Sequence, residues 1–439
     1  MGIAMTSPRI RLDYGRHGLW VNFPPGTDPL ILASQPVSEL QHPDEAIRRA
    51  LRCPMGAPPL ADLARGRRDA CIVICDITRP VPNRIILPPI LEALESAGIP
   101  DERVQILIAT GTHRPNTPAE IEEMVGREIA ERYRVHNHRC TEAGEHCTLG
   151  HSPGGVPVAL DRRYVEADLR ITTGLIEPHF MAGWSGGRKL VMPGLAALPT
   201  VEAWHSPRYL EHPRATAGIL EGNPVHEEAL AIANMARPHF IVDVTLSDGN
   251  CITGVFAGDM EEAWRHGVAF AGRSCRVAID HRVDVVVTTS AGHPLDATFY
   301  QAVKGITGAL PIVKRGGTII VAAACSEGIG SPHFARLLAE ADDLAGFADR
   351  IQQPTWTFVP DQWQVEELAR AASVARIVLV SEGIAPEDLR RIPVASAPSV
   401  EAAVAEALEV YGPGATIAVI PRGPYVIAEL ERHPSVSVE

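Results

Sequence analysis

Continuous apolar runs alternate with amphipathic stretches along most of the chain. Runs such as ACIVICDIT and VQILIATGTH end in polar residues, which is typical of parallel strands buried on both faces. In the first half, the pattern predicts strands at residues 70–78, 104–113, 132–138, 156–160 and 167–174, and helices at 88–99, 117–132, 227–236 and 260–273. This order predicts βαβ units, and therefore a mostly parallel sheet with helices on its faces.

A second α/β pattern begins near residue 276. Its predicted strands lie at 283–290, 316–325, 376–383 and 415–421, and its predicted helices at 299–314, 333–349, 361–373 and 398–411. In the first half, shorter segments predict an opening hairpin at 9–22 and a β-pair of 239–247 with 251–258. We therefore expect two α/β domains, an N-terminal one at 1–275 and a C-terminal one at 276–439.

Length and charge narrow the class of protein. A chain of 439 residues is too long for one ordinary hydrophobic core, which supports the division into two domains. The formal net charge of −13 argues against a nucleic-acid or anionic-membrane partner, because both need a basic face. No apolar run approaches the roughly 20 residues that span a bilayer, and the first 15 residues lack a signal-peptide core, so we expect a cytoplasmic protein.

Polar side chains follow the first two predicted strands. Asp76, Thr78 and Arg79 come after the first strand, and His113 ends the second. Ligands of open α/β sheets bind outside these strand ends, and the planar fork of an arginine suits a carboxylate or a phosphate. The alternative is structural, because Asp76 or Thr78 could cap the next helix and a lone histidine is more often structural than catalytic.

The stretch from residue 177 to residue 205 concentrates reactive side chains among small residues. It contains two histidines and one lysine, His179, His205 and Lys189. The lysine follows a run that includes Ser185, Gly186 and Gly187. Glycines let the backbone approach a bulky or phosphorylated partner, and a lysine beside them is a phosphate contact or an amine for covalent attachment. This combination favours a bound cofactor over a glycine-rich loop with a surface lysine.

Three further regions leave structural and functional interpretations open. The helix that begins near residue 299 carries Tyr300, Gln301 and Lys304, which suit either an anion site or a solvated face. Trp363 suits either a core position or a pocket wall. The His/Cys-rich stretch 136–151 raises the hypothesis of a zinc site, although no pair has finger spacing and strand alternation would spread these side chains over two faces.

Five motifs, DITRP, GTHRP, EPH…SGGRK, TVEAWH and YQAVKG, follow one another over nearly the whole chain. As a set they resemble the nickel-pincer-nucleotide-dependent lactate racemases and their relatives, which racemise or epimerise 2-hydroxy acids. The resemblance implies two α/β domains with mostly parallel sheets and an active site in the interdomain cleft. The family's loop usually has three glycines before the lysine, and Arg188 replaces the last of them here.

Matching positions imply the cofactor and the roles of the reactive residues. Lys189 would carry a pyridinium-3-thioamide-5-thiocarboxylic acid mononucleotide nickel complex, and His205 would be the protein ligand to nickel. His113 and His179 would be the general acids and bases on opposite faces of the substrate. The remaining cofactor-binding residues would be Asp76, Thr78, Ser185, Gly186 and Gly187. The substrate-binding residues would be Arg79, Tyr300, Gln301, Lys304 and Trp363.

The implied reaction is reversible transfer of hydride from the substrate Cα to the cofactor, with two histidines because a racemase must serve both enantiomers. The implied partners are a small 2-hydroxy acid and cofactor-maturation enzymes. Lactate and malate are both candidate substrates, since Arg188 and Arg208 could hold a second carboxylate. Two other hypotheses remain open: a zinc-dependent hydrolase that uses stretch 136–151, and a non-catalytic protein that binds a nucleotide anion.

Overall fold

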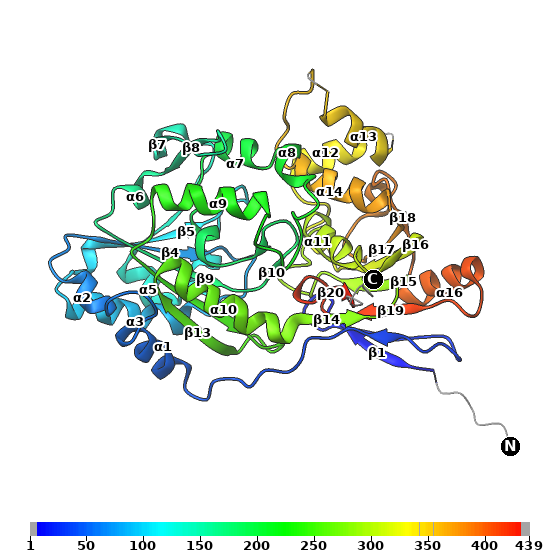
Figure 1. The fold of residues 1–439 in the computed structure, drawn as a ribbon, viewed down its shortest axis with the longest axis horizontal. Helices are drawn as coiled ribbons and strands as arrows, with labels where there is room; N and C mark the ends of the chain where they lie inside the picture. The colour runs from blue at the N-terminus through cyan, green and yellow to red at the C-terminus, as the bar shows by residue number, and fades with distance from the viewer. Residues whose placement is uncertain (1–6, 342, 354, 432–439) are drawn as a thin grey trace, which may run out of the picture. The chain divides into compact units, whose positions relative to one another are not determined.

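The computed structural model describes residues 7–341, 343–353 and 355–431. The chain divides into two compact units (Figure 1). We call Pro36–Ser274 the central unit, and we call Met1–Gln35 together with Cys275–Glu439 the terminal unit. Each unit contains a six-stranded sheet, and all neighbouring strands are parallel except one pair in the central unit. The predicted class, α/β with mostly parallel sheets, is therefore confirmed.

The sheet of the central unit positions the candidate site. In spatial order its strands are β13 (Ile252–Gly258), β12 (Phe240–Leu246), β9 (Leu169–Leu175), β4 (Ala70–Cys75), β5 (Val104–Ala109) and β6 (Arg134–Asn137). The antiparallel pair is β12 with β13, as the sequence predicted. The predicted strand at 156–160 also exists as β8 (Pro157–Asp161), but it pairs with an unpredicted strand, β7 (His146–His151), outside the main sheet.

One face of this sheet forms a hydrophobic core with α1 (Pro43–Arg52), α2 (Leu60–Ala64), α3 (Asn83–Ser96) and α4 (Pro118–Val125). Ile72 and Ile74 of β4 point into that core, and each fully buried aliphatic side chain contributes roughly 1.5–3 kcal/mol. Helix α3 begins five residues earlier than predicted, so that Pro88 and Pro89 lie inside it. The two prolines have no backbone N–H to donate, and the helix tolerates this loss because it buries Ile86 and Ile90.

The other face of the central sheet is covered by the segment that carries the reactive residues. A short helical turn, η3 (Gly187–Leu190), packs on β4 and β9. Helix α9 (Pro224–Met235) packs on η3, and α10 (Met260–Cys275) places Trp264 against Gly187. Figure 1 shows both helices in green beside the strands. The covering segment itself consists mainly of loops and short helical pieces such as η3.

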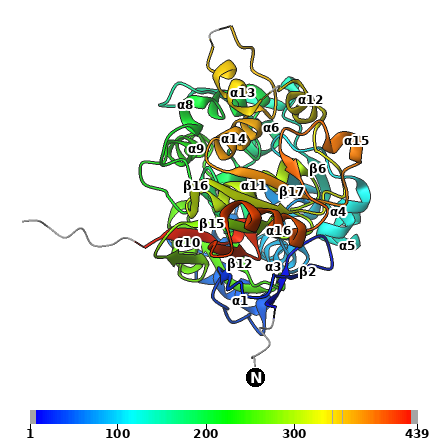
Figure 2. The same ribbon diagram turned by 90° about the vertical axis from the view of Figure 1, so that its right-hand side faces the viewer.

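The terminal unit has a sheet of its own. Its strands are, in order, β18 (Ala395–Ser396), β17 (Arg376–Val380), β16 (Val313–Ala322), β15 (Val283–Thr289), β19 (Ile417–Ile420) and β3 (Leu30–Ile31). Helices α11 (Phe299–Ala309), α12 (Pro332–Glu340), α13 (Leu344–Ile351) and α14 (Gln362–Ala372) share a core with one face. Helix α16 (Val400–Tyr411), prominent in Figure 2, shares the other core with the hairpin of β1 (Arg9–Leu12) and β2 (Leu19–Asn22).

The division of the chain differs from the predicted domains, 1–275 and 276–439, at the N-terminal end. The first 35 residues belong to the terminal unit because β3 pairs with β19 and the hairpin packs on the same sheet. Pairing between strands almost 400 residues apart leaves no local signal in the sequence. All eight cysteines are free thiols, and none of the helices that the structure describes is both long and apolar enough to cross a membrane.

Candidate functional site

The carboxyl ends of β4 and β5 bring the first two motifs together. These strands are parallel neighbours with Cys75 opposite Ala109, so the loops that follow them lie side by side. The Nδ1 atom of His113 lies 2.6 Å from Oδ2 of Asp76. The other carboxylate oxygen of Asp76 accepts hydrogen bonds from the backbone N–H and the hydroxyl of Thr78, at 3.1 and 2.6 Å. The structure thus joins His113, Asp76 and Thr78 in one network.

Asp76 is buried, yet its carboxylate is the favoured form. Burial alone would raise its pKa, but the charge and hydrogen bond of His113, the hydrogen bond of Thr78 and the charge of Arg79 outweigh burial and hold the pKa below its ordinary value. Asp76 is therefore an acceptor of hydrogen bonds at neutral pH, and it orients the imidazole of His113.

Arg79 forms an ion pair that the sequence did not reveal. Its Nε atom lies 2.6 Å from Oε1 of Glu177, and both side chains are largely buried. Glu177 stands two residues before His179, so this pair connects the first motif to the reactive stretch. Nη1 of Arg79 also donates to the carbonyl and hydroxyl oxygens of Thr78, both at 3.4 Å, so the guanidinium is tied to both the first motif and the reactive stretch.

His179 and Lys189 are in direct contact. The short strands β10 (Pro178–His179) and β11 (Gly183–Trp184) form a tight antiparallel turn with His179 opposite Gly183. Within this turn, Nδ1 of His179 accepts hydrogen bonds from the backbone N–H groups of Met181 and Ala182, at 3.3 and 3.2 Å. The other ring nitrogen, Nε2, lies 2.7 Å from Nζ of Lys189.

The glycines before Lys189 are required by their surroundings. Gly186 and Gly187 have φ values of 76° and 51°, which favour glycine. A Cβ on Gly186 would lie 2.7 Å from Oδ2 of Asp243, and one on Gly187 would lie 2.8 Å from the ring of Trp264. The same Asp243 oxygen accepts the backbone N–H of Gly187 at 2.6 Å. The loop is therefore pressed onto β12 and α10, and this sets the start of η3.

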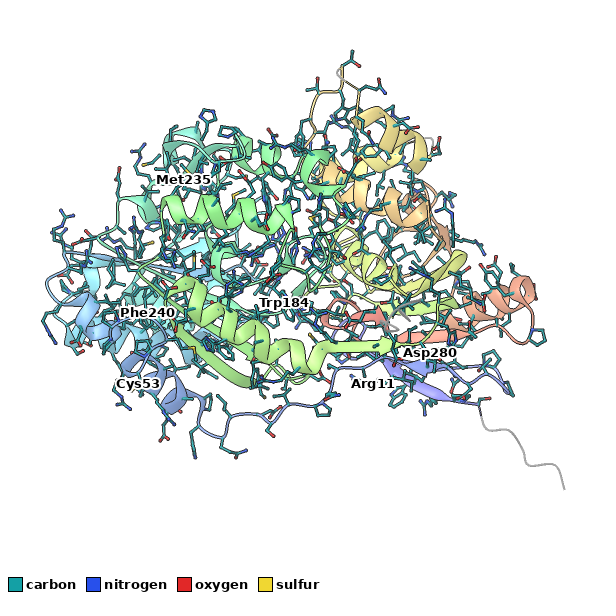
Figure 3. The ribbon with its side chains drawn as sticks, viewed as in Figure 1. Arg11, Cys53, Trp184, Met235, Phe240 and Asp280 are labelled. Atoms are coloured by element: carbon teal, nitrogen blue, oxygen red, sulfur yellow. The ribbon has the colours of Figure 1, made fainter. Side chains whose placement is uncertain are left out.

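Arg188, which the sequence suggested for a second substrate carboxylate, points into the interior of the central unit. Its side chain is 1% exposed and lies over the ring of Trp264, 4.5 Å from the centroid. Its two terminal nitrogens donate to the carbonyl oxygens of Ala182 and Trp184, both at 2.7 Å; Trp184 is labelled in Figure 3. Arg208 is exposed and lies over the ring of Tyr209.

His205 is held in its uncharged form. It follows α7 (Leu198–Trp204), is buried, and lies 4.4 Å from the ring of Trp204 between centroids. Burial lowers the pKa of His205 well below its ordinary value, and a positive charge on Lys189 acts in the same direction. An unprotonated imidazole at neutral pH is the form that ligates a metal.

Oγ of Ser185 and Oε2 of Glu177 are among the buried oxygen atoms of this region that have no hydrogen-bond partner within the described residues. Buried polar atoms are normally paired, so unpaired ones beside a reactive lysine fit a polar ligand. Together with the glycines, they mark this part of the central unit as a site for a polar ligand.

The His/Cys-rich stretch is structural. Nδ1 and Nε2 of His138 contact Oδ2 of Asp161 and the carbonyl of Ala196, at 3.0 and 3.1 Å. Nδ1 of His146 contacts the carbonyl of Glu142 at 2.9 Å. Across the described part of the chain, no three His, Cys, Asp or Glu side chains are grouped so that they could hold a metal ion. The geometry therefore does not support the zinc hydrolase.

The remaining predicted residues lie in the terminal unit, on α11 and α14. Both helices are largely buried, so the solvated-face alternative for α11 is wrong. The indole N–H of Trp363 donates to the hydroxyl of Tyr300 at 2.8 Å, and the pKa of Tyr300 is raised well above its ordinary value by burial and by Asp361. Gln301 and Lys304 are spaced to share one face of α11, and Oε1 of Gln301 is buried with no hydrogen-bond partner in the part of the chain that the structure describes.

The sequence analysis missed four residues of this arrangement: Glu177, Asn223, Asp243 and Trp264. Glu177 stands inside the EPH motif, so its position was a usable signal. Asp243 is a lone acidic residue inside an apolar strand, FIVDVTL, and a buried charge in such a run indicates a specific partner. For Asn223 and Trp264 we find no local signal, because their partners lie 42 and 79 residues away.

Both halves of the chain match domains of known proteins. Residues 14–218 match the lactate racemase N-terminal domain, and residues 279–428 match the lactate racemase C-terminal domain. The lactate racemase of Lactiplantibacillus plantarum is 38% identical over 387 residues, 88% of this chain and 91% of that protein. The lactate racemase of Thermoanaerobacterium thermosaccharolyticum is 34% identical over 423 residues, 95% of this chain and 98% of that protein.

Solved structures show the same fold. The lactate racemase apoprotein of T. thermosaccharolyticum superposes with a TM-score of 0.89 at 33% identity, covering 96% of this chain and all of that one. A Thermotoga maritima protein superposes with a TM-score of 0.69 at 17% identity, covering 88% of this chain and 98% of that one.

Replacing Gly186 by alanine is expected to destabilise the central unit more than the same change at Gly66. The two glycines have nearly equal φ values, 76° and 77°, but a Cβ on Gly66 meets no atom within 4 Å. Gly66→Ala should cost roughly 1–2 kcal/mol for the left-handed backbone, and Gly186→Ala a further 1–3 kcal/mol or so for the clash. Denaturant unfolding of both variants measures the difference; equal losses would contradict the packing described for the loop.

Asp243 predicts a particular pH dependence of stability. Burial raises its pKa from 3.8 to about 7, opposed by the N–H of Gly187 and the charge of Arg188. Between these values the folded state binds a proton that the unfolded state does not, so this stabilisation is complete below pH 3.8 and is lost as the pH rises through 7. The free energy of unfolding of the wild type, minus that of Asp243→Asn, should therefore fall between pH 4 and pH 8. Asp349→Asn, at an exposed position, is the control. If the difference in free energy of unfolding for Asp243→Asn does not change with pH, the raised pKa of Asp243 is refuted.

Proposed function

Because the chain belongs to the lactate racemase family, we propose that it racemises a lactate-like 2-hydroxy acid with a nickel-pincer nucleotide linked to Lys189. The observation that carries the proposal is the 2.7 Å contact between Nζ of Lys189 and Nε2 of His179. This contact supports the proposal because it joins the amine proposed for attachment to one proposed acid/base. The curated relatives are lactate racemases, and this makes lactate the first substrate to test.

A chain of contacts connects this pair to the second proposed acid/base. His113 contacts Asp76, and the charge of Arg79 helps to lower the pKa of Asp76. Arg79 is in turn paired with Glu177, which belongs to the same motif as His179. All of these residues belong to the central unit. The proposed acid/base groups, the arginine and the lysine therefore stand on one set of neighbouring loops at the carboxyl ends of β4, β5 and β9.

The residues fit the proposed cofactor. Gly186 and Gly187 let the backbone lie close to it, and the unpaired oxygen atoms of Ser185 and Glu177 would find partners in its polar groups. His205 would hold the nickel. When bound, the nucleotide would supply a reversible hydride acceptor, a chemistry that amino-acid side chains lack.

The chain's own residues would manage the substrate and its proton. The outer nitrogens of Arg79 would hold the substrate carboxylate, oriented by the ion pair with Glu177. As the substrate Cα becomes planar, the 2-hydroxyl must lose its proton, and it must regain a proton when Cα becomes tetrahedral again. His113 would serve one face and His179 the other, so either enantiomer could enter. That Gln301, Lys304, Tyr300 and Trp363 serve the same substrate stays a prediction.

A monocarboxylate fits better than a diacid such as malate. Arg188 was one of two arginines expected to hold a second carboxylate, and its terminal nitrogens are used on backbone carbonyls. A non-catalytic nucleotide-binding protein is the remaining alternative. It would have no use for the His113–Asp76 pair, which is a common way to orient a catalytic imidazole.

Lys189→Ala should abolish both cofactor attachment and racemisation. Full-length protein, produced together with the maturation enzymes, is analysed by intact-mass spectrometry and then incubated with L-lactate or D-lactate while optical rotation is followed. We expect a nucleotide-sized adduct and inversion of both enantiomers for the wild type and for Lys314→Ala, a lysine paired with Asp284 on the surface. Absence of an adduct and of inversion in the fully matured wild type would refute the proposal.

His113→Asn should lower kcat in both directions by roughly 10²–10⁴-fold, the usual contribution of a general acid or base. The amide nitrogen of asparagine takes the place of Nδ1 and can still donate to Asp76, so the loop should stay in place and the adduct on Lys189 should form as in the wild type. Steady-state kinetics with each enantiomer, together with intact mass, separate the two effects. Full activity of this variant would favour the non-catalytic alternative or a different base.

A further inference from the structure

The two imidazoles of the proposed site differ in the partners of their Nδ1 atoms. Oxygen atoms of an ionised carboxylate only accept hydrogen bonds, and backbone N–H groups only donate them. The tautomer of a neutral histidine follows from the partner of one ring nitrogen. His113 and His179 can therefore be assigned from contacts alone.

His113 faces an acceptor. Oδ2 of Asp76 lies 2.6 Å from Nδ1, and the other oxygen of this carboxylate already accepts two hydrogen bonds from Thr78. The ring must therefore donate through Nδ1–H. In the neutral ring this leaves a lone pair on Nε2, which is the form of a base.

His179 faces two donors. The backbone N–H groups of Met181 and Ala182 both point at Nδ1, so Nδ1 must accept and the proton of the neutral ring lies on Nε2. This is the form of an acid. The ring nitrogens of the two histidines are thus used in the opposite sense.

The peptide that faces His179 is held from behind by Asn223. The Nδ2 atom of Asn223 donates to the carbonyl oxygen of Met181 at 2.9 Å and to that of Ile219 at 3.0 Å. The Met181 carbonyl and the Ala182 N–H belong to the same trans peptide and point in opposite directions. A hydrogen bond to the carbonyl therefore aims the N–H at His179. Asn223 is fully buried, and its Oδ1 atom caps α9.

The same arrangement determines the state of Lys189. A protonated amine has donors and no acceptor, and two donors cannot share a hydrogen bond of 2.7 Å. With the proton of His179 on Nε2, the amine of Lys189 must accept through its lone pair and is uncharged. An uncharged amine is the nucleophilic form of lysine.

We propose that His113 and His179 are held in opposite tautomers, that Asn223 is the positioning residue for His179, and that His179 keeps the amine of Lys189 uncharged before the cofactor is attached. The proposal builds on the roles given to these residues in the proposed function. It gives His179 a second role, and it identifies Asn223 as a residue that acts only by positioning His179.

Nitrogen NMR tests the tautomers without any activity measurement. Full-length protein without cofactor is labelled with ¹⁵N-histidine, and the two rings are assigned by comparison with His113→Gln and His179→Gln. We expect a protonated Nδ1 and an unprotonated Nε2 for His113, and the reverse for His179. The same tautomer in both rings, or a doubly protonated His179, overturns the proposal.

The role of Asn223 is tested with Asn223→Asp, which keeps an oxygen to cap α9 but has no N–H to donate to Met181. We expect the nitrogen signals of His179 to lose the pattern of a single tautomer while those of His113 stay unchanged, which reports that the fold is intact. Asn234→Asp on the same helix is the matched control. If the aspartate variant does not fold, Asn223→Ser provides a capping oxygen and one donor instead of two. An unchanged His179 in the folded variant overturns the role of Asn223.

Acylation kinetics test the state of Lys189. Full-length protein without cofactor is treated with a trace of acetic anhydride, and acetylation is quantified by peptide mass spectrometry. For a lysine with the ordinary pKa, the rate should rise about tenfold per pH unit below that pKa. The rate at Lys189 should be nearly constant between pH 7 and pH 9, and His179→Gln should restore the tenfold rise. An ordinary profile at Lys189 overturns this part of the proposal, and racemisation by the matured enzyme separately decides the proposed function.

Discussion

The contact between Lys189 and His179 depends on a loop that folds back on itself. Both side chains come from one short stretch, and 2.7 Å between an amine and an imidazole nitrogen is reached only if the backbone between them is held in place. Arg188 holds it from within, through two carbonyls of the same stretch. Asp243 and Asn223 hold it from the sheet and from α9. Burial of an arginine and an aspartate is costly, and here each is compensated by backbone hydrogen bonds.

The sheet of the central unit explains why these loops meet. β4 lies between β5 and β9, all three strands are parallel, and so their carboxyl ends share one edge. The strands are apolar on both faces because helices cover one face and the reactive segment covers the other. A covered sheet makes a rigid base, and the proposed reactive side chains lie on the loops beyond its carboxyl edge.

Much of this arrangement was predictable from sequence, and the limits have physical reasons. The buried strands were found because a continuous apolar run that ends in Asp76 or His113 has few other interpretations. The pairing of β3 with β19 was not found, because strand pairing across the whole chain has no local pattern. Arg188 was misjudged because a cation beside a reactive lysine indicates an anion site, whereas Trp264 and two backbone carbonyls, brought together only by the fold, take its side chain into the interior.

Three basic side chains, Arg79, Arg188 and Lys189, lie on neighbouring loops, and their contacts explain how this is tolerated. Arg79 is paired with Glu177, and Arg188 is turned inward onto carbonyl oxygens. If Lys189 is uncharged, as its contact with His179 requires, the net positive charge that a substrate would meet in the central unit is small. In the proposed function, Arg79 would hold a single carboxylate there. A dianion would need a second cation that the geometry of the central unit does not supply from Arg188. Electrostatics and hydrogen-bond geometry therefore favour the same substrate class, a small 2-hydroxy monocarboxylate.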